Sequence, residues 1–187
     1  MDRPVPIDEE IQLDRKKIIV SKTDPKGYIT YANDVFQQVS GYSEEELMGA
    51  NHNIVRHPDM PKIAFKLMWD RINQGKNFKA VVKNLAKDGR YYWVITDFEP
   101  LYDASKGVII EHTAYRMAAP RKAIEIMEPI YKKLCEIEEK HGMEGSGEYL
   151  NGFLEANNIT YDEFVQTLYE EAGIWAKIYQ ALKKVFS

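Results

Sequence analysis

The sequence predicts an α+β protein in which a five-stranded antiparallel sheet carries helices on one face and is followed by a C-terminal helical extension. Short β-rich segments bounded by turn residues occur in a first group of two and a second group of three. Segments with the apolar spacing of helices separate the two groups, and a helical pattern follows the second. A single antiparallel sheet with helices packed on one face satisfies this order and leaves a pocket between the helices and the sheet.

Turn residues mark where the expected strands end. Residues 24–27 place a proline and a glycine where a tight turn needs them, so the first two strands are expected to form a hairpin. Residues 87–89 and 102–106 separate the last three strands in a similar way. The expected strands are residues 17–23, 28–31, 77–86, 90–101 and 107–115.

Capping residues and glycines mark three helices between the two groups of strands. Asn33 or Asp34 can cap a short helix that ends near Gly41. A capping box that begins at Ser43 opens a second short helix. A longer third helix follows Pro61, and its apolar stripe consists of Phe65, Met68, Trp69 and Ile72.

The C-terminal extension, residues 119–187, is expected to be a helical hairpin or a small bundle. Apolar residues recur with helical spacing from Ile124 to Ile137, and the glycine-containing residues 142–147 interrupt them. A capping box at Thr160 then opens a last long helix. The apolar stripe of this helix consists of Phe164, Leu168, Trp175, Ile178, Leu182 and Val185.

Composition and the chain's N-terminal residues argue against several classes of function. A formal net charge of −4, without a basic patch of useful size, does not suit nucleic-acid binding. Cys135 is the only cysteine, which rules out an intramolecular disulfide framework and suits a reducing compartment. Residues 1–10 lack the order of a signal peptide, and no apolar run approaches the roughly 20 residues that cross a bilayer. We therefore expect a cytoplasmic protein that does not insert directly into a membrane.

The densest group of polar residues is NHNIVRHPDMP, residues 51–61, between the second and third expected helices. It holds two histidines, an arginine and an aspartate, and loops with so many donors often carry function. The residues alone leave a second interpretation open. In that interpretation Arg56 pairs with Asp59, Asp59 caps the next helix, and both histidines are solvated.

This segment resembles the signature of PAS domains of the aerotaxis-receptor (Aer) type, in which it contributes to an FAD site. The resemblance continues through YITYAND at residues 28–34 and VKN at residues 82–84, and it reaches EPIYK at residues 128–132. It implies a PAS fold with the helices on one face of the sheet. The expected organisation is residues 1–16 as an N-terminal cap or flexible segment, 17–118 as a PAS sensor domain, and 119–187 as the helical extension.

The resemblance also implies which residues line or support the FAD site. They are Asn33, His52, Arg56, His57, Asp59, Phe65, Trp69, Asn84 and Trp93. The chemistry agrees, because isoalloxazine is a flat amphipathic ring that suits an aromatic slot with a few amide and cationic groups.

Individual residues can be interpreted either as part of the FAD site or as purely structural. Asn84 shares strand parity with Val82, so its amide points to the same face as an apolar row. Arg56 suits a pyrophosphate or an anionic reduced flavin, because its guanidinium offers bidentate donors. In the simpler interpretation Asn33 is only a helix cap and Trp69 only a core residue. Phe78 is a departure, because the family pattern has a tryptophan in this strand.

Alternative functions remain open at this stage. His52 or His57 could be an axial ligand of haem. The pocket could also hold no cofactor, which would make the domain an interaction module. We expect no enzyme, because we find no sequence feature for the nicotinamide site that a flavin reductase would need. Light-driven adduct chemistry is not expected either, because Cys135 lies in the extension.

The resemblance implies a redox or energy-taxis sensor, as in aerotaxis, that signals by conformational change. In the family the output is a methyl-accepting chemoreceptor module on the same chain, and this sequence has no such module. We therefore expect the partner to be a separate membrane-bound methyl-accepting chemotaxis transducer, contacted by the sheet or by residues 120–186. Homodimerisation is a further alternative.

Overall fold

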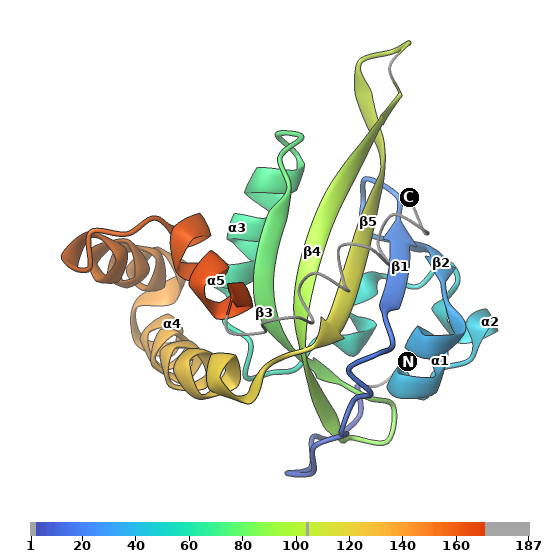
Figure 1. Cartoon of the computed structure of the whole chain (residues 1–187), viewed down its shortest axis with the longest axis horizontal. Coiled ribbons are helices and arrows are strands. Elements are labelled where there is room, and N and C mark those ends of the chain that lie inside the picture. The colour runs from blue at the N-terminus through green and yellow to red at the C-terminus, as the bar shows by residue number, and fades with distance from the viewer. Residues whose placement is uncertain (1–2, 104, 171–187) are drawn as a thin grey trace.

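The computed structural model describes residues 3–103 and 105–170, and within them it confirms the α+β architecture (Figure 1). The antiparallel sheet has the strand order β2-β1-β5-β4-β3. Trp175, Ile178, Leu182 and Val185, expected on the last helix, lie outside the described residues. The strands are β1 Ile19–Thr23, β2 Ile29–Ala32, β3 Phe78–Leu85, β4 Tyr91–Asp103 and β5 Val108–Ala118.

The first two helices between β2 and β3 are short and capped by their own sequence. Asn33 accepts a hydrogen bond from the Phe36 amide at the start of α1, and Gly41 ends this helix with a φ of 74°. The expected capping box at Ser43 is present at the start of α2. These elements are α1 Asp34–Ser40, α2 Glu44–Leu47, the 3₁₀ helix η1 His52–Val55, and α3 Lys62–Ile72.

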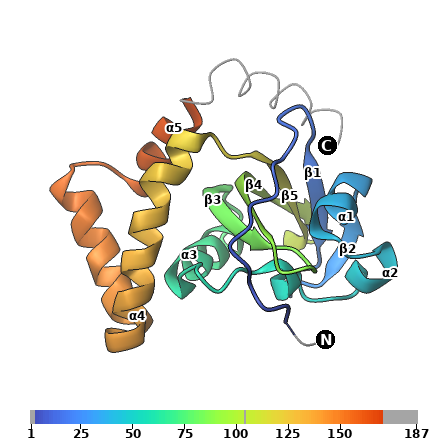
Figure 2. The same cartoon turned by 90° about the horizontal axis from the view of Figure 1, so that it is seen from below.

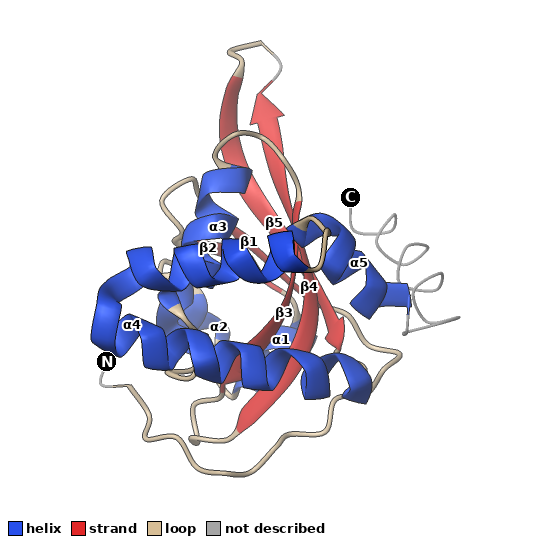
Figure 3. Cartoon of the chain, turned by 90° about the vertical axis from the view of Figure 1, so that its left-hand side faces the viewer, coloured by secondary structure: helices blue, strands red, loops and turns tan. Residues whose placement is uncertain are grey.

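The C-terminal extension contains α4 Arg121–Ala156 and α5 Tyr161–Glu170. The expected interruption at residues 142–147 is confined to Gly142, whose φ of 70° and ψ of −176° kink α4. Gly145 and Gly147 lie within the helix after the kink. Figure 3 shows the two arms of α4 as separate rods that meet at this bend. Within the described residues, no helix is long and apolar enough to cross a membrane.

Strand parity divides the sheet into two faces with different coverings. We call the face that carries Asn84 and Arg116 the inner face; α1, η1 and α3 pack against it. The outer face carries Val81 and Trp93, and α4 packs against the β3 side of this face through Tyr131. Figure 2 shows α1 and α3 on one side of the sheet and α4 displaced beyond the β3 edge.

The N-terminal residues lie along the turn between β3 and β4. The Ile7 amide donates to the Gly89 carbonyl at 2.8 Å, and the Ile11 amide donates to the Tyr91 carbonyl at 2.7 Å. At the other end of the sheet, β4 and β5 pair as far as Asp103 and Val108, which is beyond the ends of their outer neighbours. This hairpin is the long projection in Figure 1.

Candidate functional site

A cavity of about 310 Å³ lies between the inner face of the sheet and the helices η1 and α3. Its volume is at the lower end of the range of small-molecule sites. The strands contribute its polar floor, and α3 contributes much of its apolar wall. The lining residues are Ser21, Thr23, Lys26, Gly27, Asn51, His52, Asn53, Val55, Arg56, Phe65, Met68, Trp69, Ile72, Val82, Asn84, Phe98, His112, Ala114 and Arg116.

The floor of the cavity is a hydrogen-bonded group formed by Ser21, His52 and Arg116. Arg116 on β5 donates to the Ser21 Oγ at 2.9 Å, and its Nη2 lies 3.0 Å from the His52 Nε2. The Ser21 Oγ also lies 3.0 Å from that nitrogen. The His52 ring stacks on Phe36 of α1, with ring centroids 5.6 Å apart. The floor therefore holds a fixed guanidinium, which suits carbonyl or anionic oxygens.

His52 is held as a neutral imidazole. A guanidinium can only donate, so the Nε2 beside Arg116 is the acceptor nitrogen of the ring. Burial lowers the pKa of His52 to about 3, and the charge of Arg116 acts in the same direction. His52 therefore carries no charge at neutral pH.

The apolar wall comes from the helical stripe of α3. Phe65, Met68, Trp69 and Ile72 recur at helical spacing and all line the cavity. Trp69 lies against the turn between β1 and β2, where Gly27 has a φ of 87°. A Cβ at Gly27 would lie 3.1 Å from the Trp69 ring, so the close approach of these two residues needs a glycine.

Arg56 and Asn84 form a second polar edge of the cavity. Their backbones form an isolated antiparallel bridge, which holds the end of η1 on β3. The Arg56 guanidinium lies over the Phe65 ring at 4.2 Å and donates to the Met60 carbonyl at 3.2 Å. Burial lowers the pKa of this guanidinium, although it remains a cation at neutral pH.

Five of the nine expected site residues line the cavity: His52, Arg56, Phe65, Trp69 and Asn84. Asn33 lies outside it. The Asn33 side chain accepts from the amides of Val20 and Phe36 and donates to the Ile18 carbonyl. It therefore joins α1 to β1, which is a structural role.

Asp59, His57 and Trp93 also lie outside the cavity lining. The Asp59 carboxylate lies 2.7 Å from the Lys83 ammonium, on the opposite face of β3 from Asn84. His57 accepts from the Asp59 amide, and burial, followed by the charge of Lys83, lowers the pKa of His57 to about 4. Trp93 stacks on Tyr131 of α4, with centroids 6.4 Å apart.

Neither alternative contact expected for Asp59 occurs. Its carboxylate pairs with Lys83 rather than with Arg56, and the start of α3 is capped from the extension. The Glu138 carboxylate of α4 accepts from the Lys62 and Ile63 amides, both at 2.8 Å. This contact ties the extension to the helix that carries the apolar wall.

Sequence reasoning missed the cavity residues of β1 and β5. Ser21, His112 and Arg116 come from strands that are far apart in the chain and adjacent in the sheet. One signal was available: His112 and Ala114 alternate along the expected strand at residues 107–115, and Arg116, one residue beyond its expected end, continues the same face. No motif connects that face to the loop at residues 51–61.

Comparisons with known proteins identify the class of this domain. The model of the PAS fold family matches residues 29–113. A light-oxygen-voltage domain of the blue-light photoreceptor Aureochrome1, in its dark state, superposes with a TM-score of 0.53 at 22% identity, covering 58% of this chain and 80% of that one. This second likeness shows the fold alone. The chain therefore contains a PAS domain.

Sequence similarity to known proteins defines the type of PAS domain. The chain is 45% identical over 116 residues to the aerotaxis receptor of Escherichia coli (strain K12), covering 62% of this chain and 22% of the receptor. It is 29% identical over 81 residues to the biofilm dispersion protein BdlA of Pseudomonas aeruginosa, covering 43% of this chain and 19% of that protein. The PAS domain is of the aerotaxis-receptor type, and the chain spans about a fifth of the length of these relatives.

Proposed function

We propose that this PAS domain binds a flavin, FAD in particular, and acts as a redox sensor in taxis signalling. The observation that carries the proposal is the cavity itself, found in a domain 45% identical to the corresponding part of an aerotaxis receptor. A flat ring system suits a slot between the Phe65 and Trp69 wall and the sheet. Arg116, Asn84 and Arg56 supply donors at its polar edges.

The chain's own residues determine what such a ring would experience. A bound flavin supplies reversible reduction, which changes the charge and hydrogen bonding of its ring. Arg116 holds a positive charge on the cavity floor, and neutral His52 fixes the orientation of that guanidinium. A change of charge in the cavity therefore acts on groups attached to β1, β5 and η1.

The extension contacts several elements that surround the cavity, which supports a role in signalling. Glu138 caps α3, and the Cys135 thiol donates to the Asp59 carbonyl at 3.3 Å in the loop that follows Arg56. On the outer face, the Tyr131 hydroxyl donates to the Val81 carbonyl at 2.6 Å, one residue from the cavity residue Val82. We propose that α4 reports the state of the cavity to a methyl-accepting chemotaxis transducer without enzymatic turnover.

Haem and an empty pocket are the competing assignments. His52 would have to leave Arg116 and Ser21 to ligate an iron, and His57 lies outside the cavity lining. These contacts favour an organic ring held by hydrogen bonds over a metal-centred cofactor.

The test is the absorption spectrum of the protein purified in the dark without added cofactor, before and after dithionite and after denaturation. Bands near about 375 and 450 nm that bleach on reduction, a general flavin signature, support the proposal, and chromatography of the released compound distinguishes FAD from shorter flavins. A Soret band would show that the cofactor is haem and would overturn the flavin proposal. A colourless protein that cannot be reconstituted with FAD would leave an interaction module.

A further inference from the structure

A second hollow, of about 420 Å³, lies next to the cavity, between the N-terminal residues, α2 and η1. Asn51 and Asn53 line both hollows, so the two meet along these residues. The helix η1 forms the partition, because His52 and Val55 line the cavity whereas Ile54 lines the second hollow. We call the second hollow the rim groove.

The N-terminal residues form one wall of the rim groove and are anchored on the turn between β3 and β4. The Ile7 amide donates to the Gly89 carbonyl at 2.8 Å. Val5 passes so close to Gly89 that its carbonyl oxygen leaves no room for a Cβ there. Arg3 precedes Val5 by two residues and lines the groove, so the anchored segment determines where its guanidinium can reach.

Two guanidinium groups lie where the cavity and the rim groove meet. Arg3 lines the groove, and Arg56 lines the cavity at the end of η1. Burial, followed by the charge of Arg3, lowers the pKa of Arg56, which agrees with two neighbouring cations. Within residues 3–103 and 105–170 neither guanidinium has a carboxylate partner, and Arg56 donates to the Met60 carbonyl. An anion bound between them would offset their mutual repulsion.

The acidic side chain of the rim groove is already engaged. Glu46 of α2 lines the groove, and its carboxylate lies 2.6 Å from the Lys87 ammonium. Lys26 of the β1–β2 turn lines the cavity and adds a further positive charge. The described residues around the junction therefore favour a negatively charged ligand over a cation.

The cavity is too small to enclose a whole dinucleotide. Its volume of about 310 Å³ is at the lower end of the range of small-molecule sites, whereas FAD carries a diphosphate and an adenosine beyond its tricyclic ring. When the ring is held in the cavity, the diphosphate and adenosine must lie outside it. Pro4, Met48 and Ile54 give the rim groove apolar surface, which suits the flat face of an adenine.

We propose that the rim groove binds the adenosine diphosphate part of FAD, and that Arg3 and Arg56 hold its diphosphate. The proposal rests on the flavin assignment made above and extends the site to the N-terminal segment. Guanidinium groups suit phosphate oxygens, because each offers parallel donors and stays charged at physiological pH. The rim groove then distinguishes FAD from riboflavin, which has the same ring and no phosphate.

The experiment compares wild type, Arg3→Gln and Arg3→Lys by titration with FAD and with riboflavin, and by urea unfolding of the apoproteins. We expect Arg3→Gln to weaken FAD binding about three- to tenfold and to leave riboflavin affinity unchanged. Its urea midpoint should match wild type, because Arg3 is exposed. Arg3→Lys keeps the charge and should recover part of the FAD affinity.

Arg15→Gln is the matched control, because Arg15 is an exposed arginine near the N-terminus that lines neither hollow. It removes the same charge and should bind FAD like wild type. A ³¹P spectrum reports the contact directly: the diphosphate resonances of FAD should shift on binding to wild type and shift less in Arg3→Gln at saturating protein.

The outcomes separate this inference from the flavin assignment. If Arg3→Gln binds FAD as tightly as wild type, or loses affinity for FAD and riboflavin equally, the rim groove does not hold the diphosphate while the flavin assignment stands. If wild type binds neither FAD nor riboflavin, or shows a Soret band, the flavin assignment falls and this inference with it.

Discussion

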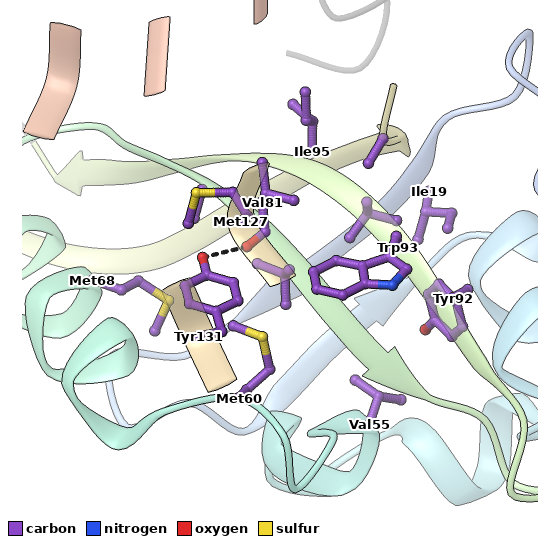
Figure 4. Packing of buried hydrophobic residues seen from close by; sticks show 14 of the residues in the cluster. Ile19, Val55, Met60, Met68, Val81, Tyr92, Trp93, Ile95, Met127 and Tyr131 are labelled. Carbon is purple, nitrogen blue, oxygen red and sulfur yellow. Dashed lines mark hydrogen bonds between the residues drawn. The ribbon is translucent and has the colours of Figure 1, made fainter. Parts of the chain in front are cut away.

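The two faces of the sheet carry different kinds of side chain and contribute different properties. On the outer face, Trp93 and Met127 pack around Val81, and the only polar contact drawn there is the hydrogen bond from Tyr131 to the Val81 carbonyl (Figure 4). The inner face has a cavity floored by Arg116 and His52. The outer face therefore contributes packing stability, and the inner face carries the groups that can recognise a ligand.

Neighbouring residues of a strand point to opposite faces, so a single position along a strand decides which environment a side chain enters. Asn84 is paired with Tyr92, and Lys83 is paired with Trp93. Asn84 consequently faces the cavity while Trp93, next to Tyr92 in sequence, faces α4. Lys83 and Asn84, which are adjacent in the VKN motif, thus lie on opposite sides of the sheet. Membership of a motif does not by itself place a side chain in the site.

The largest expected effect compares a tryptophan from each face. Trp93 is 4% exposed and stacked on Tyr131, so Trp93→Ala should lower the free energy of unfolding by about 3–5 kcal/mol. Trp69 is partly exposed and borders the cavity, so Trp69→Ala should cost less stability and weaken FAD binding more. Urea unfolding of the apoproteins and FAD titration measure the two quantities. Equal losses of stability and affinity in both variants would contradict the division of the faces.

Local chemistry explains why most of the fold was predictable. The turn at residues 24–27 ends β1 with a glycine at a φ of 87°, and Ser43 forms the capping box expected from its spacing. Such signals depend on residues a few positions apart. The kink of α4 was less well predicted, because Gly145 and Gly147 occur in the expected interruption and are nevertheless helical. Neighbouring turns of the helix override the weak helix propensity of glycine.

The site was predictable only where one continuous segment supplied it. His52 and Arg56 were found because the segment at residues 51–61 is distinctive, and both line the cavity. His112 and Arg116 reach the cavity through pairing of β1 with β5, which joins Thr23 to His112 and Ile19 to Arg116. No local pattern encodes which distant strand will pair. The residues of the polar floor could therefore be identified only in the structure.

The next effect tests the inner face by acidification. The pKa of His52 is about 3 in the folded protein, mainly because of burial, whereas a histidine in an unfolded chain titrates near about 6.5. Below about pH 6.5 the unfolded state binds a proton that the folded state does not, so stability falls as the pH is lowered toward 3. The loss should approach about 1.4 kcal/mol per pH unit for this histidine.

A substitution of His52 tests whether this loss of stability at low pH comes from the inner face. His52→Gln keeps an acceptor for Arg116 and removes the titration, so the slope of stability against pH between 6 and 4 should decrease by about one proton. Exposed His141→Gln is the control and should keep the wild-type slope. His57, with a pKa of about 4, adds a separate loss that remains in both variants. An unchanged slope in His52→Gln would show that His52 does not resist protonation in the fold.

The smallest effect concerns the contact that connects the two faces. Glu138 lies on α4, which packs on the outer face. Its carboxylate caps α3, the helix that forms the apolar wall of the cavity. Pro61 at the cap position has no side-chain acceptor, and Ser146 beyond the kink donates to the same carboxylate at 3.1 Å. Glu138→Ala should therefore lower the free energy of unfolding by about 0.5–2 kcal/mol, because two amides of α3 lose their acceptor.

The neighbouring Glu139 provides the control, since it is exposed on the same turn of α4. Hydrogen exchange should become faster at Lys62 and Ile63 in Glu138→Ala and stay unchanged in Glu139→Ala. If FAD binding reaches α4 through α3, added FAD should slow exchange at these two amides in wild type and have less effect in Glu138→Ala. Equal exchange in all three proteins would mean that the cap does not connect the cavity to the extension, and that any signal leaves through the sheet and Tyr131 instead.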